Sequence, residues 1–394
     1  MTVRLGLRSR SALLAVGAVV LTGCAPASGD ELVRSTCTPT PAADLVPADG
    51  VYVGVNVDWA QQTLAEYGAS LGERPAVAVS FVSFPLTDDD RDNLDAAVEQ
   101  VADDAGMLLL TLEPQQGLAA VTGAVATDLA GRLDRYNRSG VPVIVRFAHE
   151  MNGSWYAWGQ EPSAYVTAFR TVATAVHADA PGSAMMWAPN YGGGYPFTGG
   201  AHEAAAGSAQ AGLLDTDRDG VVTSADDPYA PYWPGDDAVD WVGMSLYHWG
   251  HAYPWGENEV PEEGTFAARL RGEYVGFGGD ERDVPDFYGI YGEQHDKPVA
   301  IPETAALYTP GAGGASELAV KQAWWRQVLA ADLHRDLPRL AMVNWFEWDK
   351  HETEVGGRID WTVTSDDAVL AAYRADLPGW ARWADAVPIC DTTG

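Results

Sequence analysis

The sequence is poor in basic residues and in histidine. Its 394 residues hold 24 Lys and Arg against 55 Asp and Glu, a formal net charge of −31. Such a charge repels nucleic acid and anionic lipid headgroups, so we expect no nucleic-acid partner, whereas a neutral polymer is not repelled. The 8 histidines are scattered, with no pair at zinc-ligand spacing. Zinc-dependent hydrolysis is therefore disfavoured, and we expect no cofactor for catalysis.

Long apolar runs are confined to the start of the chain. An arginine-containing start leads into the apolar stretch Ala12–Leu21, which is too short to span a bilayer as a mature helix. Residues 1–23 are therefore predicted to be an export signal, and Leu21–Cys24 resembles a bacterial lipobox, in which cleavage precedes a lipidated Cys24. We expect an exported chain held by its lipid on the outer face of the cell membrane. The alternative is ordinary secretion as a soluble protein, after cleavage a few residues later.

Only three cysteines are present. If Cys24 carries lipid, Cys37 and Cys390 remain as a pair in an oxidising compartment. A disulfide between them would hold the two ends of the mature chain together, as expected of a barrel whose first and last elements are neighbours. Residues 24–49, which contain many Ser, Pro, Thr and Ala, are predicted to be a flexible tether. Residues 50–394 are predicted to be a single domain, and we expect a monomer.

Eight short apolar runs follow the tether and are typical of buried strands. They are Val51–Val57, Ala76–Val82, Met107–Leu112, Pro142–Phe147, Ala184–Ala188, Val239–Leu246, Pro298–Ile301 and Leu340–Phe346. Helical patterns lie between several of them, at Trp59–Leu71, Thr87–Asp104, Val121–Tyr136, Pro162–Ala178 and Ala315–Leu333. No repeat of fixed period stands out. Strands that alternate with helices predict an α/β fold, a parallel (β/α)8 TIM barrel.

Polar and aromatic residues follow nearly every predicted strand. In a parallel barrel the active site is built at the carboxyl ends of the strands, so these residues would share one rim. They are Asp58-Trp59, Ser83-Phe84, Glu113-Pro114, His149-Glu150, Asn190-Tyr191, Tyr247-His248-Trp249, Glu303 and Trp345–Trp348. The opposite rim offers little chemistry.

The segment Pro142–Gly159 is the richest of these strand ends. Its strand closes with Arg146, His149 and Glu150, and the following loop holds Trp155 and Trp158. A carboxyl can protonate a glycosidic oxygen, and indole faces can stack on pyranose rings, so we expect a site that binds sugar. The alternative is a strand end with a solvated glutamate and two core tryptophans.

Two carboxyls are the candidate catalytic pair. Glu150 ends the fourth predicted strand and Glu303 the seventh, and these strands face each other across the mouth of an eight-stranded barrel. Retaining glycosidases hold such a pair about 5–5.5 Å apart and inverting ones roughly 6.5–9.5 Å apart, and sequence does not choose between them. The other carboxyls on this rim, expected to bind substrate or to support the pair, are Glu113, Glu347, Asp58 and Glu352. Arg146 has the same strand parity as Glu150, whereas His149 has the opposite one and reaches the site only if the strand end twists or bulges.

The block Arg146–Gly153, followed by Trp155 and Trp158, resembles the acid/base segment of glycoside hydrolase family 26. Its members are chiefly retaining endo-β-1,4-mannanases on (β/α)8 barrels, with β-glucanases and β-1,3-xylanases among them. The similarity extends over most of the chain after Val51, including Pro234–Gly243. The resemblance implies that Glu150 is the acid/base and Glu303 the nucleophile.

The same resemblance implies roles for neighbouring residues. Tyr247 matches a tyrosine that hydrogen-bonds the nucleophile, and Trp345 or Trp348 would form the aromatic floor beneath the sugar at the cleavage point. Trp59, Glu113 and Asn190 are further candidate substrate contacts at strand ends. The loop after Tyr247, with its histidines and aromatic residues, suits subsites that select the glycan.

A second motif lies between the fifth and sixth predicted strands. Residues 215–226 match an EF-hand-type calcium loop, with the turn glycine at its sixth position and Asp in place of Glu at the twelfth. The predicted ligands are Asp215, Asp217, Asp219, the backbone carbonyl of Val221, and Asp226. The alternative is an acidic, solvated turn. A calcium ion here would hold one wall of the cleft without taking part in the chemistry.

The expected function is that of an exported endo-β-1,4-mannanase acting on mannan or glucomannan by double displacement. The alternatives are a β-1,3(4)-glucanase or β-1,3-xylanase on the same barrel, and, outside enzymes, a cell-surface glycan-binding lipoprotein.

Overall fold

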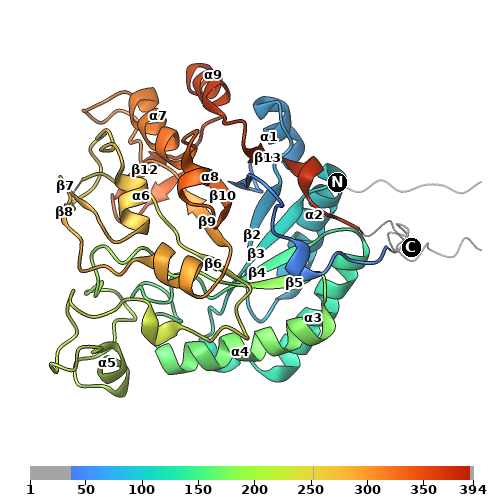
Figure 1. Ribbon diagram of the computed structural model, residues 1–394, viewed down its shortest axis with the longest axis horizontal. Helices are drawn as coiled ribbons and strands as arrows, with labels where there is room; N and C mark the ends of the chain where they lie inside the picture. Colours follow the sequence, from blue (N-terminus) through green and yellow to red (C-terminus); the bar gives the residue numbers. More distant parts are fainter. Residues whose placement is uncertain (1–36, 252, 391–394) are drawn as a thin grey trace, which may run out of the picture. The chain divides into compact units, whose positions relative to one another are not determined.

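A closed barrel of parallel strands forms the centre of the molecule (Figure 1). The computed structural model describes residues 37–251 and 253–390, so the predicted export signal and Cys24 lie outside the described residues. The barrel strands are β1 (Val51–Val57), β2 (Val77–Ser83), β3 (Met107–Glu113), β4 (Val143–Phe147), β5 (Ser183–Trp187), β6 (Trp241–Gly243), β9 (Val299–Thr304) and β10 (Leu340–Glu347). β10 pairs with β1 in parallel, from Tyr52 opposite Met342 to Val57 opposite Glu347, and this pairing closes the barrel. The predicted (β/α)8 fold is confirmed.

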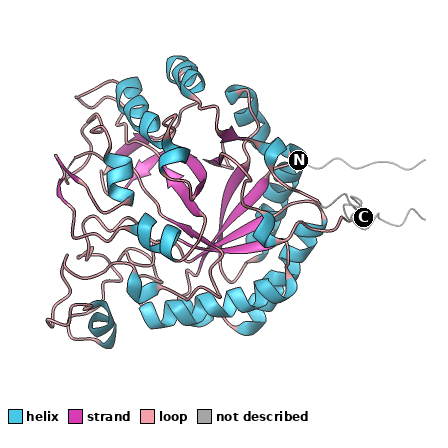
Figure 2. Ribbon diagram, in the orientation of Figure 1, coloured by secondary structure: helices cyan, strands magenta, loops and turns pink. Residues whose placement is uncertain are grey.

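Helices surround the barrel on its outside (Figure 2). They are α1 (Leu64–Leu71), α2 (Asp88–Asp104), α3 (Gly123–Arg138), α4 (Pro162–Asp179), α5 (Ala209–Leu214), α6 (Thr265–Leu270), α7 (Glu317–Val328), α8 (Leu333–Asp336) and α9 (Asp367–Asp376). α1 begins later than the predicted Trp59, because Thr63 and Glu66 form a capping box that starts the helix at Leu64. A similar reciprocal cap, between Thr87 and Asp90, starts α2.

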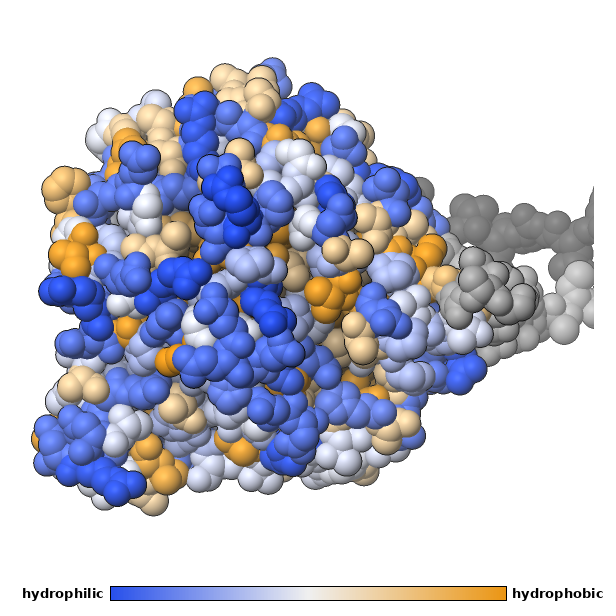
Figure 3. All heavy atoms as spheres, viewed as in Figure 1, coloured by the Kyte–Doolittle hydropathy of each residue, from blue (hydrophilic) through white to orange (hydrophobic). Residues whose placement is uncertain are grey.

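Strand alternation separates two hydrophobic clusters. One set of side chains fills the barrel interior and includes Tyr52, Leu109, Ile144 and Met186. The other, larger set points outward from the strands and packs against the helices. The face shown in Figure 3 is mainly hydrophilic, with scattered apolar residues. Among the described residues no helix is both long enough and apolar enough to cross a bilayer.

Long connections carry the elements that the sequence patterns did not predict. The β6–β9 connection contains α6, a hairpin of β7 (Val275–Gly276) and β8 (Gly279–Asp280), and a π-helix at Tyr288–Gln294. A second hairpin, β11 (Asp349–Glu352) with β12 (Gly357–Asp360), follows β10. These elements are short, so their patterns are too brief to distinguish from loops.

The two ends of the described chain meet at the amino ends of the barrel strands. Cys37 and Cys390 form a disulfide with their Cα atoms 5.8 Å apart. The Cys37 backbone N–H donates to the carbonyl of Arg138, just ahead of β4. The short strand β13 (Ala381–Arg382) also pairs with the start of β1. Both ends are therefore held on the rim opposite the carboxyl ends of the strands.

Candidate active site

The backbone turns sharply where β4 ends. β4 stops at Phe147, and both Ala148 and Glu150 adopt left-handed conformations, with φ of 47° and 55°. Such values are uncommon outside glycine and cost on the order of 1–3 kcal/mol each. Because regular strand alternation ends at Phe147, the side chains of His149 and Glu150 are not forced onto opposite faces of the strand. Both side chains reach the barrel mouth.

Hydrogen bonds to β5 hold this turn in place. The Glu150 N–H donates to the carbonyl of Ala188 at 2.9 Å. The Asn152 side chain accepts from the Asn190 N–H and donates to the Asn190 carbonyl, each at 2.8 Å. The buried amide of Asn152 thus joins the segment after β4 to the end of β5, a role that the sequence pattern did not reveal.

Glu150 and Glu303 meet across the barrel mouth. One carboxylate oxygen from each, together with a ring nitrogen of His149, lie within 4.8 Å of one another. This proximity matches the closely spaced pair of retaining glycosidases, about 5–5.5 Å apart, better than the roughly 6.5–9.5 Å pair of inverting ones.

Glu303 is held by a cation and a phenol. Arg146, fully buried inside the barrel, forms an ion pair with Glu303 through Nη1 and donates to the Ser245 hydroxyl through Nη2 at 2.7 Å. Tyr247 donates its hydroxyl to the other Glu303 oxygen at 2.7 Å. Burial, and then the charge of Glu303, raise the pKa of Tyr247 well above its usual range, so the phenol remains a donor. These donors fix the orientation of the Glu303 side chain.

Glu150 has the opposite environment. Burial first, and then the charge of Glu303, raise its pKa to about 7. The Trp155 indole N–H donates to Glu150 at 3.1 Å and opposes this rise. One carboxyl of the pair can therefore give a proton near neutral pH while the other is held by donors.

His149 is a neutral group beside this pair. Burial, and then the charge of Arg146, lower its pKa well below the usual range. Its Nε2 lies 3.3 Å from the Tyr156 hydroxyl. The imidazole therefore presents a dipole, rather than a positive charge, to the two carboxyls.

Trp158 is a supporting residue, so its predicted role as a substrate contact is wrong. Its side chain is fully buried, donates to the His149 carbonyl at 2.7 Å, and stacks on Tyr156 with ring centroids 4.4 Å apart. A sugar cannot reach a ring enclosed in this way. Trp155, by contrast, is 38% exposed beside Glu150 and remains available to a ligand.

Trp345 does not form the floor of the mouth, so that prediction is also wrong. It is buried outside the barrel against Trp325 and Tyr373. Strand alternation turns the next residue, Phe346, toward Tyr247, with ring centroids 5.8 Å apart. Trp348 stacks on Phe346 at 5.7 Å, donates to Asn56 at 3.2 Å, and is only half-buried. Of the two tryptophans offered for the floor, Trp348 is the one that stays accessible.

Trp361 is a buried ring that supports the aromatic residues of the mouth, and the strand pattern did not predict it. Its ring lies 5.4 Å from that of Tyr247 and 5.0 Å from that of Trp249. Its indole N–H donates to Glu352 at 2.9 Å. Trp361 follows β12, which lies after the last barrel strand. The expectation that site residues follow barrel strands therefore does not reach it, and the sequence shows only one tryptophan in a polar segment.

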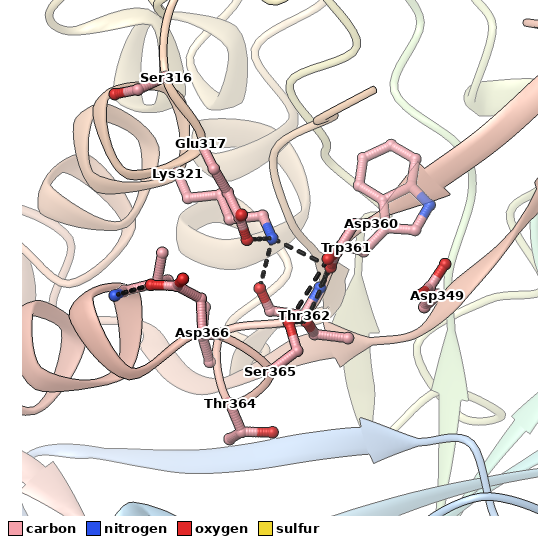
Figure 4. Close-up of polar contacts among 12 residues, drawn as sticks. Ser316, Glu317, Lys321, Asp349, Asp360, Trp361, Thr362, Thr364, Ser365 and Asp366 are labelled. Carbon is pink, nitrogen blue, oxygen red and sulfur yellow. Dashed lines mark hydrogen bonds and ion pairs between the residues drawn. The ribbon is translucent and has the colours of Figure 1, made fainter. Parts of the chain in front are cut away.

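A buried ion network holds the segment that carries Trp361 (Figure 4). The ammonium group of Lys321, from α7, contacts Glu317 at 2.5 Å, Asp360 at 3.1 Å and the Thr362 carbonyl at 2.6 Å. Asp360 in turn accepts from the backbone N–H and the hydroxyl of Thr362. A hydrogen-bonded lysine on a surrounding helix therefore sets the path of the chain at the barrel mouth.

The other rim carboxyls have partners of their own. Glu347 accepts from the N–H groups of Val363 and Thr364, and burial raises its pKa to about 7. Asp58 accepts from the N–H of Ala60. Glu113 lies close enough to the pair for the charge of Glu303 to raise its pKa. Burial raises that pKa more, and a hydrogen bond from Gln115 lowers it.

Trp59 and Asn190, two further predicted substrate contacts, form hydrogen bonds with neighbouring strand ends. Trp59 is half-buried and donates its indole N–H to the Val79 carbonyl at 2.8 Å. Asn190 is partly exposed, with its backbone fixed by Asn152. Both lie at strand ends, where these bonds fix their positions.

The acidic loop gathers three of its predicted calcium ligands. One carboxylate oxygen from each of Asp215, Asp217 and Asp219 lies within 4.8 Å of the others. Asp226 is not part of this group. Its carboxylate accepts instead from the N–H groups of Thr216, Asp217 and Thr223. Val221 is 61% exposed on the same turn. The conformation supports a three-carboxylate cluster rather than the full predicted set.

Part of the site lies in a segment that is similar to a known family. A model of glycosyl hydrolase family 26 matches residues 96–188, a stretch that includes β3, β4, Glu150 and β5. Over these residues the chain is similar to glycosyl hydrolase family 26. Glu303 lies beyond the matched stretch, so its place in the candidate site rests on its contacts with Arg146 and Tyr247.

Individual relatives are distant. Endoglucanase H of Acetivibrio thermocellus is 23% identical over 291 residues, which are 70% of this chain and 25% of the relative. The aligned stretch thus spans about a quarter of that protein. Among solved structures, a Cellulomonas fimi endo-β-1,4-mannanase double mutant has a TM-score of 0.56 at 17% identity, covering 91% of this chain and 80% of the other. GH26C from a Muricauda species has a TM-score of 0.52 at 14% identity, covering 86% and 88%. These likenesses establish the shared fold.

Proposed function

We propose that this chain is a retaining endo-β-glycanase that works by double displacement through Glu150 and Glu303. The observation that carries the proposal is the carboxyl pair, whose oxygens lie within 4.8 Å in contrasting environments. One carboxyl has its pKa raised to about 7, and the other is paired with Arg146 and Tyr247.

In the first step a Glu303 oxygen attacks the anomeric carbon, and Glu150 gives its proton to the departing glycosidic oxygen. The C–O bond to the leaving sugar breaks, and a glycosyl ester with Glu303 forms. In the second step the Glu150 carboxylate takes a proton from water as that water attacks the same carbon. The ester bond then breaks, which regenerates the Glu303 carboxylate and the Glu150 acid.

We propose β-1,4-mannan or glucomannan as the substrate. The similarity to the Cellulomonas fimi endo-β-1,4-mannanase supports this choice. The similarity to endoglucanase H supports the alternative, a β-glucan. β-1,3-xylan is a third candidate. These chains are neutral, so a protein with a net charge of −31 does not repel them.

The test is reducing-sugar release from galactomannan, glucomannan, barley β-glucan and β-1,3-xylan by wild type, Glu150→Ala and Glu303→Ala. We expect activity on a mannan and its loss in both variants. NMR of the first product formed should show the β-anomer before mutarotation. An α-anomer as the first product, or full activity in Glu303→Ala, would overturn the proposed mechanism. Activity confined to β-glucan would replace mannan as the substrate and leave the mechanism standing.

We also propose that Asp215, Asp217 and Asp219 bind a structural Ca²⁺. Hard cations prefer oxygen ligands, and these three carboxylates converge on one turn. Thermal unfolding with calcium and with a chelator tests the site. We expect a lower Tm with chelator in wild type and no calcium dependence in Asp217→Ala. Equal Tm values for wild type under both conditions would refute it.

For localisation we propose a monomer exported to the outer face of the cell membrane and held there by lipid on Cys24. Support comes from the lipobox-like Leu21–Cys24 sequence alone. Membrane fractionation of wild type and Cys24→Ala tests the anchor, and the variant is expected in the soluble fraction. Gel filtration of the soluble form tests the monomer.

A further inference from the structure

The loop that follows β6 carries a row of aromatic rings that begins at the catalytic pair. Tyr247, which donates to Glu303, lies 6.2 Å from Trp249 between ring centroids. Trp249 lies 5.3 Å from Trp255, and Trp255 lies 5.3 Å from Tyr253. The row thus runs without a break from the barrel mouth to the surface.

The outer end of this row faces solvent. Tyr253 is 72% exposed, and Trp249 and Trp255 are only half-buried. Core packing would enclose such rings, because each large aromatic side chain gains free energy when its surface leaves water. Exposed aromatic rings that continue an enclosed site are therefore available to a ligand that extends out of that site.

Buried polar contacts hold the loop in a defined conformation. Asn258, almost fully buried, accepts from the Thr309 N–H at 2.7 Å and donates to the Thr309 carbonyl at 3.1 Å, which joins the loop to the segment after β9. Glu259 accepts from the His251 N–H at 2.7 Å, and its carbonyl lies 2.8 Å from Nε2 of His248. A surface held in this way loses little conformational freedom when a ligand binds.

We propose that Trp249, Trp255 and Tyr253 form a platform that binds additional sugar units of a neutral polysaccharide, beyond the units at the cleavage point. The inference rests on the proposed glycanase function and deepens it. The apolar faces of pyranose rings match the flat aromatic faces, and a neutral chain meets no repulsion from the acidic surface. The platform favours long chains and cleavage at internal bonds.

The test compares a long and a short substrate. kcat/KM is measured on the polysaccharide that wild type hydrolyses and on an aryl glycoside that occupies the cleavage point only. In Tyr253→Ala the ratio of the two values, long over short, is expected to fall about tenfold, which corresponds to roughly 1.4 kcal/mol of lost stacking. Tyr253→Phe keeps the ring and should restore the ratio.

Phe277 supplies a matched control. It is 75% exposed on the neighbouring β7–β8 hairpin and contacts His251 rather than the row. Phe277→Ala should keep the wild-type ratio. An unchanged ratio in Tyr253→Ala, or an equal fall in Phe277→Ala, would overturn the platform. Failure of wild type to hydrolyse any glycan would instead overturn the proposed function, so the two failures are distinguishable.

Discussion

At the scale of single residues, Glu150 and Glu303 have the same side chain but different surroundings. Glu303 is paired with Arg146 and accepts from Tyr247. For Glu150, burial and the charge of Glu303 outweigh the effects of Arg146, Ser245 and the Trp155 indole N–H. The contrast is the basis of the roles proposed for them, Glu303 as nucleophile and Glu150 as acid.

The raised pKa of Glu150 predicts the alkaline limb of the pH profile. The protonated form is needed for the first step and is lost as pH rises through about 7, so kcat/KM should fall above that pH. In Trp155→Phe the hydrogen bond that stabilises the carboxylate is removed, so the limb should move to higher pH. The pH dependence of kcat/KM for both proteins is the measurement. A limb that stays in place would contradict the role of Trp155.

Tyr247→Phe removes one donor to Glu303 and keeps the ring beside Trp361. We expect kcat to fall about 10²-fold, as when one preorganised donor is lost from an active site. The Tm should stay close to that of wild type, because the packing is retained. A fall in Tm together with kcat would indicate a structural defect instead.

Residue type and position after a strand pointed to Arg146, Glu150, Tyr247 and Glu303, which the structure brings together at the barrel mouth. The same rule failed for Trp158 and Trp345, since the accessibility of a ring depends on which way the backbone turns after the strand. The position of Phe346 depends on which face of β10 it occupies, and that of Asn152 on its hydrogen bonds to Asn190. Both depend on other parts of the chain, so one segment of sequence does not predict them.

At the scale of elements, the eight barrel strands were predictable because buried parallel strands are continuous apolar runs between turn residues. The hairpin β11–β12 was not predictable. Its strands are short and polar, and long-range contacts of Lys321 and Glu347 hold the segment that follows it.

Lys321→Met should therefore be strongly destabilising. It leaves Asp360 and Glu317 without their buried cation, a change that costs about 3–5 kcal/mol. Urea unfolding provides the free energy of unfolding. The exposed pair Arg358 and Asp349 on the hairpin is the control, and Arg358→Met should cost at most about 1 kcal/mol. Equal effects of the two substitutions would show that burial of the network does not matter.

At the scale of the whole molecule, the disulfide joins residues 353 positions apart. Closing so long a loop restricts the unfolded chain, so the double variant Cys37→Ser/Cys390→Ser should lose roughly 2–5 kcal/mol of stability. Thermal unfolding is the measurement, and the reduced wild type should match the variant. Activity well below the Tm should be retained, because the bond lies on the rim opposite the catalytic pair. Loss of activity at low temperature would contradict this separation.

The position of that bond also determines how the protein can be handled. Cys390 lies beside Gly140, just before β4, whereas Glu150 lies just after β4 on the far rim. A bead, fusion partner or solid support coupled through the residues next to Cys37 or Cys390 is therefore attached at the amino ends of the barrel strands, on the side opposite Glu150. The mouth then points away from the support, toward an incoming polymer that is too large to pass beneath an immobilised enzyme.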